Sequence, residues 1–431
     1  MARLRPLRAV RYDTGHVDFG SVLAPPYDVI SPAQQQDLYS RDLRNVVRID
    51  FGAELPDDVP GTDDRYTRAR GHLESWLNLG ILRRDERPAL YVTEHEFLGA
   101  DGNRHVRRGI LGRVPARPWD ESEVLPHERT MRGPKQDRLN LMRATRMQTS
   151  AVWITWDRAP GMPAALDAAT DRAPDAAGET PGELDVEQHR LWVVDDPEQL
   201  AAFDAALAPA RLYIADGHHR FETAAAYAAE RRAAEPDAPE DADFAMTLVY
   251  ACAADDPVIE VWPTHRLVRA PIAAREGAST PIGVLSTQLG PDWSVAPAPD
   301  LATATAQAHA LRATHHAFGV ADAQGAAVLI TARTETASPA AALDVSVLAD
   351  RVLHDALGIT PEQITGGALA FTRDVAEAEQ AVRDGRAALA FTVNPTSTAE
   401  IIAVSDAGEV MPQKSSYFYP KVPTGLLLSP L

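Results

Sequence analysis

Short apolar runs of strand length alternate with helix-forming stretches along most of this 431-residue chain. Such interleaving predicts a mixed α/β (α+β) architecture, because an all-α or all-β fold would show one periodicity throughout. The expected strands cover residues 46–51, 90–93, 151–155, 191–194, 212–215, 246–251, 316–320, 327–330 and 387–392. The clearest helical patterns cover residues 66–78, 197–207 and 221–232.

The length of the chain predicts two or three compact units, at roughly 100–200 residues per domain. We expect an N-terminal α/β region over residues 1–157, a central core segment over residues 189–270 and a C-terminal α/β lobe over residues 271–431 that closes the site. Residues 158–188 mix Pro, Gly, Asp and Ala without a sustained pattern, which predicts a linker or insertion.

The charge, the cysteine content and the hydropathy of the chain restrict its possible partners and compartment. There are 61 acidic and 42 basic residues, a formal net charge of −19, which argues against a nucleic-acid partner because such binding depends on Lys and Arg neutralising phosphates. The single cysteine, Cys252, excludes an internal disulfide and fits a reducing compartment. No run of 18 apolar residues and no signal-like start occur. We therefore expect a cytoplasmic protein without a membrane partner.

The segment RLYIADGHHRFETAAAY carries the strongest chemical signal. A short strand is expected to end near residue 215, Asp216 and Gly217 to form a turn, and a helix to begin near His219. The unpaired amides of a first helical turn favour an anion, and Gly217 would let the backbone approach a phosphate. Arg220 would add a planar fork of donors, and the adjacent histidines a proton carrier. The competing interpretation is an Asp-capped helix start with exposed histidines.

A second segment, VLPHERTMRGPKQDRLNLMRATR, is basic within an acidic chain. His127 and Glu128 are expected at the end of an extended stretch, followed by a turn into a helix. The basic side chains form a cluster of the kind that binds phosphate groups, made of Arg129, Arg132, Lys135, Arg138, Arg143 and Arg146. The alternative is a solvated helix face that pairs with acidic groups.

Three shorter segments add polar residues beside prolines. APPYDVISP places Tyr27 and Asp28 in a turn before a helix that Ser31-Pro32 opens, VWPTHRL carries His265 and Arg266, and MPQKSSYFYPKVPTG carries Lys414 and Lys421. Taken separately, each segment is typical of a loop whose backbone is restricted by proline.

Together, these five segments, in this order, resemble the motif set of the DUF1015 family, from about residue 24 to residue 425. The block ADGHHRFETA is its most specific mark. The resemblance implies a central fold like that of ParB and sulfiredoxin, in which a glycine-containing loop ending in Arg holds nucleotide phosphates; the matching positions are Gly217 to Arg220. Some relatives in that superfamily phosphorylate free L-serine with ADP or ATP. The resemblance therefore implies a nucleotide-dependent small-molecule kinase.

The expected site takes its residues from all five segments, and we expect them to line one pocket. Proton transfer is assigned to His219, Glu128, His218 and Asp28. Phosphate binding is assigned to Asp216, Gly217, His218, Arg220, Lys135, Arg138 and His127. Substrate binding is assigned to Tyr27, His265, Arg266, Lys414 and Lys421, and Mg²⁺ to Asp216 and Asp137. Arg220 is expected to serve the ligand rather than the core; the competing view is a surface ion pair with Asp216 or Glu222.

Two other functions stay open at this stage. A nucleotide-binding regulator of the ParB type would sense or hydrolyse the nucleotide without an acceptor. A metal-dependent hydrolase would use the histidines, although adjacent His218 and His219 do not share a helix face as i, i+4 ligands do. A homodimer is equally left open.

Overall fold

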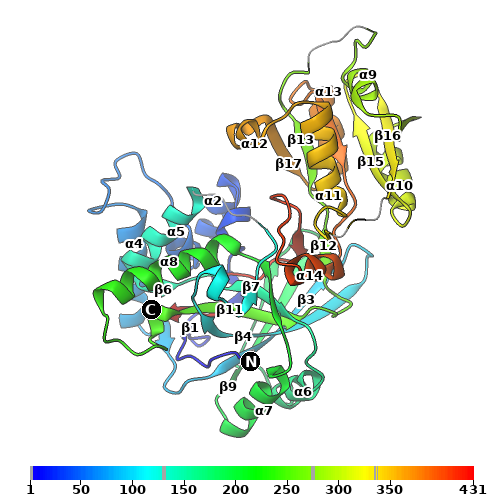
Figure 1. Cartoon of the computed structure of the whole chain (residues 1–431). Helices are drawn as coiled ribbons and strands as arrows, with labels where there is room; N and C mark the ends of the chain where they lie inside the picture. The colour runs from blue at the N-terminus through cyan, green and yellow to red at the C-terminus, as the bar shows by residue number, and fades with distance from the viewer. Residues whose placement is uncertain (1–2, 129–132, 273–276, 334–335, 337) are drawn as a thin grey trace. The chain divides into compact units, whose positions relative to one another are not determined.

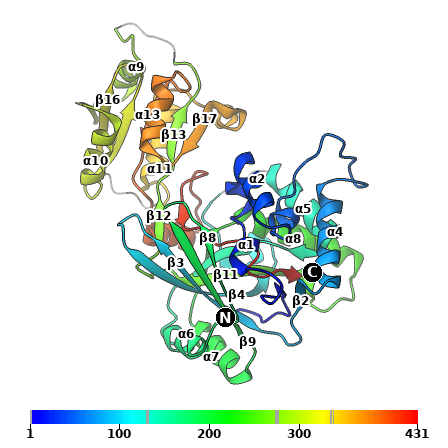
Figure 2. The ribbon, with the colours of Figure 1, turned by 180° about the vertical axis from the view of Figure 1, so that it is seen from behind.

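The computed structural model describes residues 3–128, 133–272, 277–333, 336 and 338–431. The chain is a mixed α/β protein, as the sequence predicted, and divides into two compact units (Figures 1 and 2). Unit 1 comprises Met1–Pro126, Thr130–Glu260 and Pro420–Leu431, and unit 2 comprises His127–Arg129 and Val261–Tyr419. Within the described parts of the chain, no helix is both long and apolar enough to cross a bilayer.

Unit 1 is built on an eight-stranded mixed sheet in the order β5-β10-β7-β11-β4-β3-β9-β8. These strands are β5 (Val124–Leu125), β10 (Leu212–Asp216), β7 (Val152–Trp156), β11 (Met246–Ala253), β4 (Arg104–Pro115), β3 (Leu90–Leu98), β9 (Val186–Val194) and β8 (Ala176–Pro181). β11 pairs in parallel with β7 and antiparallel with β4. Five of the expected strands, over residues 90–93, 151–155, 191–194, 212–215 and 246–251, lie in this sheet. Their apolar runs are typical of strands that are covered on both faces.

Two groups of helices accompany this sheet. Helices α6 (Met162–Thr170) and α7 (Pro197–Leu207) lie together and supply Leu166 and Phe203 to a core with strand residues such as Ile154. Helices α4 (Arg65–Asn78), α5 (Gly133–Thr145) and α8 (His218–Ala234) lie apart from that pair (Figure 1). Met142 of α5 packs with Tyr227 of α8 in a second core.

Unit 2 contains a six-stranded antiparallel sheet in the order β14-β16-β15-β18-β13-β17. Its strands are β14 (Trp293–Ala298), β16 (Ala326–Ala332), β15 (His315–Ala321), β18 (Leu389–Thr392), β13 (His265–Val268) and β17 (Leu369–Thr372). Helices α10 (Leu301–Leu311) and α13 (Val375–Arg383) supply buried Leu301 and Val382 to its core.

The structure differs from the expectations in two places. Residues 46–51 were expected as a strand, but Val47–Asp50 form helix α3, whose Val47 and Ile49 pack among other helices rather than in a sheet. Residues 158–188 were expected as a linker, but they contain α6 and the edge strand β8. Tertiary packing of Met162 and Leu166 against the sheet explains why a segment of weak local pattern is ordered there.

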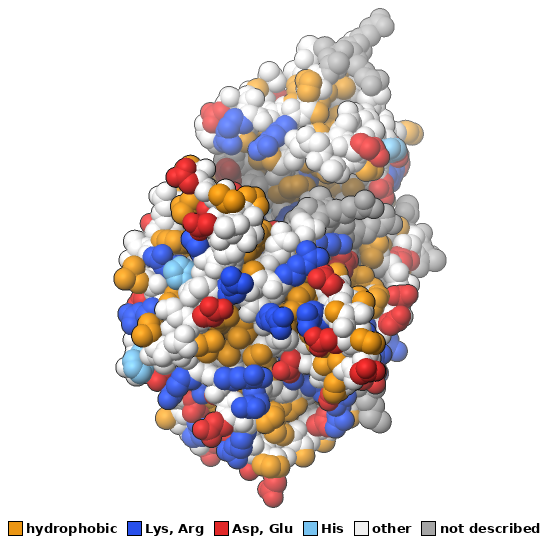
Figure 3. All heavy atoms as spheres, turned by 90° about the vertical axis from the view of Figure 1, so that its left-hand side faces the viewer, with side chains coloured by type: hydrophobic (Ala, Val, Ile, Leu, Met, Phe, Trp, Pro, Cys, Tyr) orange, Lys and Arg blue, Asp and Glu red, His pale blue; other side chains and the backbone are white. Residues whose placement is uncertain are grey.

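The first two of the three expected parts fall mostly in unit 1, and the third falls mostly in unit 2. Residues 189–260 and nearly all of residues 1–157 belong to unit 1, and residues 271–419 belong to unit 2. The last twelve residues return to unit 1 at Pro420, which brings one motif segment back to the large sheet. On the face drawn in Figure 3, basic side chains lie among acidic ones.

Candidate functional site

The turn between β10 and α8 has the geometry that the sequence predicted. β10 ends at Asp216, and its register with β7 shifts between Ile214 and Asp216. Gly217 adopts a left-handed conformation, with φ 94° and ψ 30°, and α8 begins at His218. The amide of Phe221 bonds the Gly217 carbonyl at 3.0 Å, so the helical ladder starts there and the amides before it point out of the helix end.

Asp216 is the ionic centre of this turn. Its Oδ2 accepts a hydrogen bond from Arg220 at 2.5 Å, and its Oδ1 accepts one from Lys421 Nζ at 2.5 Å. Burial alone would raise the pKa of Asp216, but the Lys421 and Arg220 cations hold it well below its usual range. The carboxylate is therefore ionised and shared between two cations, one from its own motif segment and one from the last segment.

Arg220 is buried beneath the turn, with 9% of its side chain exposed. Besides Asp216, its guanidinium donates to the backbone carbonyl of Ala151 at the start of β7. Burial would lower the pKa of Arg220, but Asp216, Asp28 and other neighbouring groups raise it. The Asp216 ion pair that the competing view named is present, but it is enclosed, with 9% of the Arg220 side chain and 17% of the Asp216 side chain exposed. That Arg220 serves a ligand stays a prediction.

A second ionic group adjoins Arg220. The Arg138 guanidinium lies 4.0 Å from the ring centroid of Tyr27, and it donates to Asp137 Oδ2 at 2.7 Å and to the Asp50 carbonyl at 2.7 Å. Burial raises the pKa of Tyr27 to about 12, with a further contribution from the exposed Asp28 beside it. Four motif segments thus contribute to neighbouring groups within unit 1: Tyr27 and Asp28, Asp137 and Arg138, Asp216 and Arg220, and Lys421.

Asp50 lies between the ionic group around Arg220 and the one around Arg138, and the sequence did not predict it as a site residue. Its Oδ1 accepts hydrogen bonds from Thr149 at 2.6 Å and Ser150 at 2.9 Å, and its Oδ2 has no hydrogen-bond partner among the described residues. A cavity of about 30 Å³ is lined by Asp50, Arg138 and Arg220, which is room for a water molecule. The available signal was a carboxylate within the apolar run VVRIDF.

Other basic residues of the second motif pair with carboxylates. Lys135 forms an ion pair with Glu222, which also accepts a hydrogen bond from Trp119 Nε1 at 2.7 Å. Arg143 pairs with Glu230 at 2.7 Å on an exposed face. Of the four described members of the expected cluster, Lys135, Arg138 and Arg143 pair with acids, as in the alternative interpretation, and no ion pair is described for Arg146. Phosphate binding by this cluster stays a prediction. Arg129 and Arg132 lie outside the described residues.

Unit 2 holds the remaining motif residues in a group of its own. Glu128 Oε1 accepts the Lys414 amide at 2.8 Å, and His127 Nε2 lies 3.2 Å from Ser416 Oγ. Arg266 donates to the Lys414 carbonyl at 3.3 Å, and burial lowers its pKa to about 10. Lys414 adopts φ 58°, which is uncommon for a residue with a side chain. Because these residues belong to unit 2, the single pocket stays a prediction.

Two expected roles concern residues that are held within the protein. His265 lies buried in β13, where its Nδ1 accepts the Val393 amide at 3.4 Å and burial lowers its pKa to about 4, and its role in substrate binding stays a prediction. Asp216 and Asp137 were expected to hold Mg²⁺. Asp216 is paired with two cations, and Asp137 accepts from Arg138 and from Arg65 at 2.5 Å. These carboxylates do not fit a metal site.

Comparisons with known proteins place the chain in a family and leave its activity open. Residues 4–346 match the family described as "Protein of unknown function (DUF1015)". No curated protein matches the chain. A conserved hypothetical protein from Pyrococcus furiosus is similar at 12% identity over 73% of this chain and 93% of that chain, with a TM-score of 0.37.

A free serine kinase is also among the similar solved structures. In complex with AMP it matches at 12% identity over 73% of this chain and 92% of that chain, with a TM-score of 0.37. A variant of a free serine kinase in complex with ADP matches at 11% identity over the same shares, with a TM-score of 0.37.

Proposed function

The chain belongs to the DUF1015 family, and from the site that its motifs form we propose that it is a nucleotide-dependent small-molecule kinase. It would bind ADP or ATP and transfer a phosphoryl group to a hydroxyl-bearing metabolite such as free L-serine. The hydroxyl oxygen would bond to the terminal phosphorus, the bond to the nucleotide's bridging oxygen would break, and the hydroxyl proton would pass to a protein base. AMP leaves if ADP is the donor, and ADP leaves if ATP is the donor.

The observation that carries this proposal is the turn at Gly217. Gly217 stands in a left-handed conformation at the start of the 17-residue helix α8, and a glycine has no side chain to cap the first amides of that helix. Such a helix start binds an anion through its amides and its partial positive charge. Arg220 and Lys421 lie behind the turn and add positive charge, while Asp216 offsets one of the two.

The structure changes how the cations would act in this proposal. Arg220 and Lys421 are bonded to Asp216, so the backbone amides would make the direct phosphate contacts and the cations would set the local potential. His219 in the first turn of α8 is the proposed proton acceptor in unit 1, and Glu128 is the candidate in unit 2.

A nucleotide-binding regulator is the second candidate. It is favoured by the ion pairs of Asp216 with Arg220 and Lys421. Cations fixed on Asp216 would stabilise a bound phosphate, but they would not stay in contact with a phosphoryl group during its transfer. The two candidates differ in whether turnover of the nucleotide depends on an acceptor.

A titration followed by an activity assay tests the proposal. AMP, ADP and ATP are titrated calorimetrically into the full chain, with EDTA and then with magnesium chloride. Nucleotide consumption is next followed with and without L-serine and other hydroxyl metabolites. We expect binding, with turnover only when an acceptor is present. Nucleotide consumption that is the same with and without an acceptor, or nucleotide binding without any consumption, would favour the regulator. An absence of nucleotide binding would reject both candidates.

A further inference from the structure

Lysine is rare in this chain, and its few positions are informative. Only three of the 42 basic residues are lysines, Lys135, Lys414 and Lys421, and all three lie in the motif segments. Arginine and lysine differ in shape, hydration and reactivity, so an enclosed lysine is not equivalent to an arginine at the same position. Lys421 has 8% of its side chain exposed and is the most enclosed ammonium for which an ion pair is described.

The backbone next to Lys421 is held by a residue from the middle of the large sheet. Arg107 on β4 is fully buried and donates from one terminal nitrogen to the Pro420 carbonyl at 2.9 Å. Its Nε donates to the Tyr250 hydroxyl at 3.2 Å, and its guanidinium carbon lies 4.1 Å from the Trp153 ring centroid. A planar, multiply bonded guanidinium has little freedom to move, so it fixes the carbonyl that precedes Lys421.

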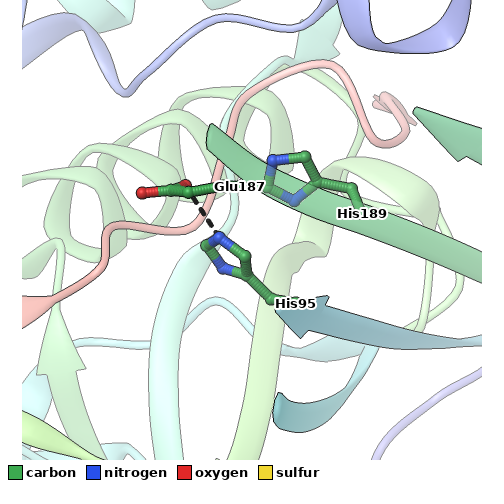
Figure 4. Close-up of side chains that lie close together, drawn as sticks. All are labelled: His95, Glu187 and His189. Atoms are coloured by element: carbon green, nitrogen blue, oxygen red, sulfur yellow. Dashed lines mark hydrogen bonds and ion pairs between the residues drawn. The ribbon is translucent and has the colours of Figure 1, made fainter. Parts of the chain in front are cut away.

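Arg107 contacts His95, which lies together with Glu187 and His189 on β3 and β9 (Figure 4). Arg107 donates to His95 Nδ1 at 3.2 Å, and His95 Nε2 lies 2.7 Å from Glu187 Oε2. Because a guanidinium only donates, Nδ1 must accept, and the neutral His95 therefore carries its proton on Nε2 and donates it to Glu187. His189 Nε2 lies 2.7 Å from the Thr180 hydroxyl.

The same three side chains could be taken for a metal site, since their donor atoms lie within 4.8 Å of one another. The contact of Arg107 argues against this interpretation. A metal on His95 Nε2 would displace the proton to Nδ1, which would then face the guanidinium donor against donor. The ion would also place a second positive charge beside a buried cation. The adjoining cavity, lined by His95, Arg107 and His189, holds about 10 Å³, too little for a hydrated ion.

We propose that Arg107, fixed by His95 and Glu187 without a metal, is a positioning residue that holds the Pro420–Lys421 backbone so that the Lys421 ammonium stays on Asp216. Val422, Pro423 and Leu426 line the same small cavity as His95 and Arg107, so these residues after Lys421 pack beside the network. The importance of that placement for phosphate binding rests on the proposed function, whereas the placement itself does not.

The test is competitive lysine labelling with acetic anhydride at pH 8, without nucleotide, on the full chain. Mass spectrometry gives the labelling rate of Lys421 relative to Lys135, which lies on α5 and has 32% of its side chain exposed. We expect Lys421 to be protected in the wild type and Arg107→Gln to raise the ratio about tenfold, as the loss of one buried hydrogen bond would. The matched control is Arg113→Gln, on the same strand, whose partner is Asp243 at 2.6 Å.

Several outcomes would overturn the proposal. An unchanged ratio in Arg107→Gln would show that Lys421 does not depend on Arg107. An equal rise of the labelling ratio in Arg113→Gln would show that a general loss of stability exposes Lys421, without a specific role for Arg107. One zinc per purified wild-type chain, lost in His95→Gln, would establish the metal site instead. If Arg107→Gln does not fold, Glu187→Gln replaces it, with a smaller rise expected. Failed nucleotide binding by the wild type would reject the proposed function and leave the labelling result intact.

Discussion

Lys421 Nζ lies 2.5 Å from Asp216 Oδ1, although 205 positions separate the two residues in the sequence. Between them the chain passes through Val261–Tyr419 of unit 2 and returns to unit 1 at Pro420. The turn at Gly217 is therefore completed by the last residues of the chain. A carboxylate that two cations share contributes to folding as well as to the electrostatics of the site.

Asp216 should make the stability of the protein depend on acid pH. Its pKa is lowered in the folded state, so its contribution is present above the unfolded-state pKa of about 3.9 and is lost as the pH falls below that value. Asp216→Asn should therefore be much less stable than the wild type at pH 7, and the difference should shrink between about pH 4 and pH 2. Urea unfolding at a series of pH values measures it.

The control for this prediction is Asp204→Asn. Asp204 pairs with Arg3, half of whose side chain is exposed. The pKa of Asp204 is also lowered by Arg3, but solvent screens that pair, so its removal should change stability little at any pH. A constant difference between wild type and Asp216→Asn from pH 7 to pH 2 would contradict the assignment.

Arg220 should behave as a structural residue under the site. Arg220→Ala removes one cation from Asp216 and leaves the Ala151 carbonyl without this donor, so we expect a loss of about 3–5 kcal/mol in the free energy of unfolding. Arg143→Ala breaks a pair in which each side chain is more than 40% exposed and should cost about 0–1 kcal/mol. Chemical denaturation compares the two variants. Equal, small losses would mean that Arg220 is not a structural partner of Asp216.

The elements that the sequence predicted best are those with strong local signals. The strand, glycine turn and helix around Gly217 were predicted because an apolar run, a positive-φ residue and a helix-forming stretch each act locally. The helix over Val47–Asp50 was not, since a run of four residues, two of them β-branched, carries no helical period and depends on packing.

The partners of the site residues were harder to predict than the residues themselves. Tyr27, Arg138, Asp216 and Lys421 were chosen as polar groups in turns, and the structure brings them into adjoining groups of unit 1. Asp50 and Arg107 were missed because a charged residue inside a strand or an apolar run resembles an ordinary surface position until the fold buries it. The scarcity of lysine draws attention to Lys135, Lys414 and Lys421 equally, and only the fold distinguishes Lys421 by its burial on Asp216.

Gly217 should not tolerate a side chain. A Cβ at this position would lie 2.8 Å from Arg220 Nε, and φ 94° strains an L residue. Gly80→Ala is the control, because Gly80 also has a positive φ of 70° but has open space around its Cα. We expect Gly217→Ala to lose more stability than Gly80→Ala and to bind phosphate-containing nucleotides more weakly. Thermal unfolding and calorimetry separate the two effects. Equal behaviour of the variants would show that the turn makes no special contact.

Lys421 should require an ammonium specifically. Lys421→Met removes the charge and leaves Asp216 with Arg220, so nucleotide affinity and stability should both fall. Lys421→Arg keeps the charge, but a guanidinium does not fit the space of a side chain that is 8% exposed, so we expect it to recover only part of the loss. Lys135→Arg, on a more exposed ion pair, should behave like the wild type. Calorimetric titration with ADP, alongside urea unfolding, measures each variant. Wild-type affinity and stability in Lys421→Arg would mean that any cation serves on Asp216, and that the rarity of lysine in this chain has no bearing on the site.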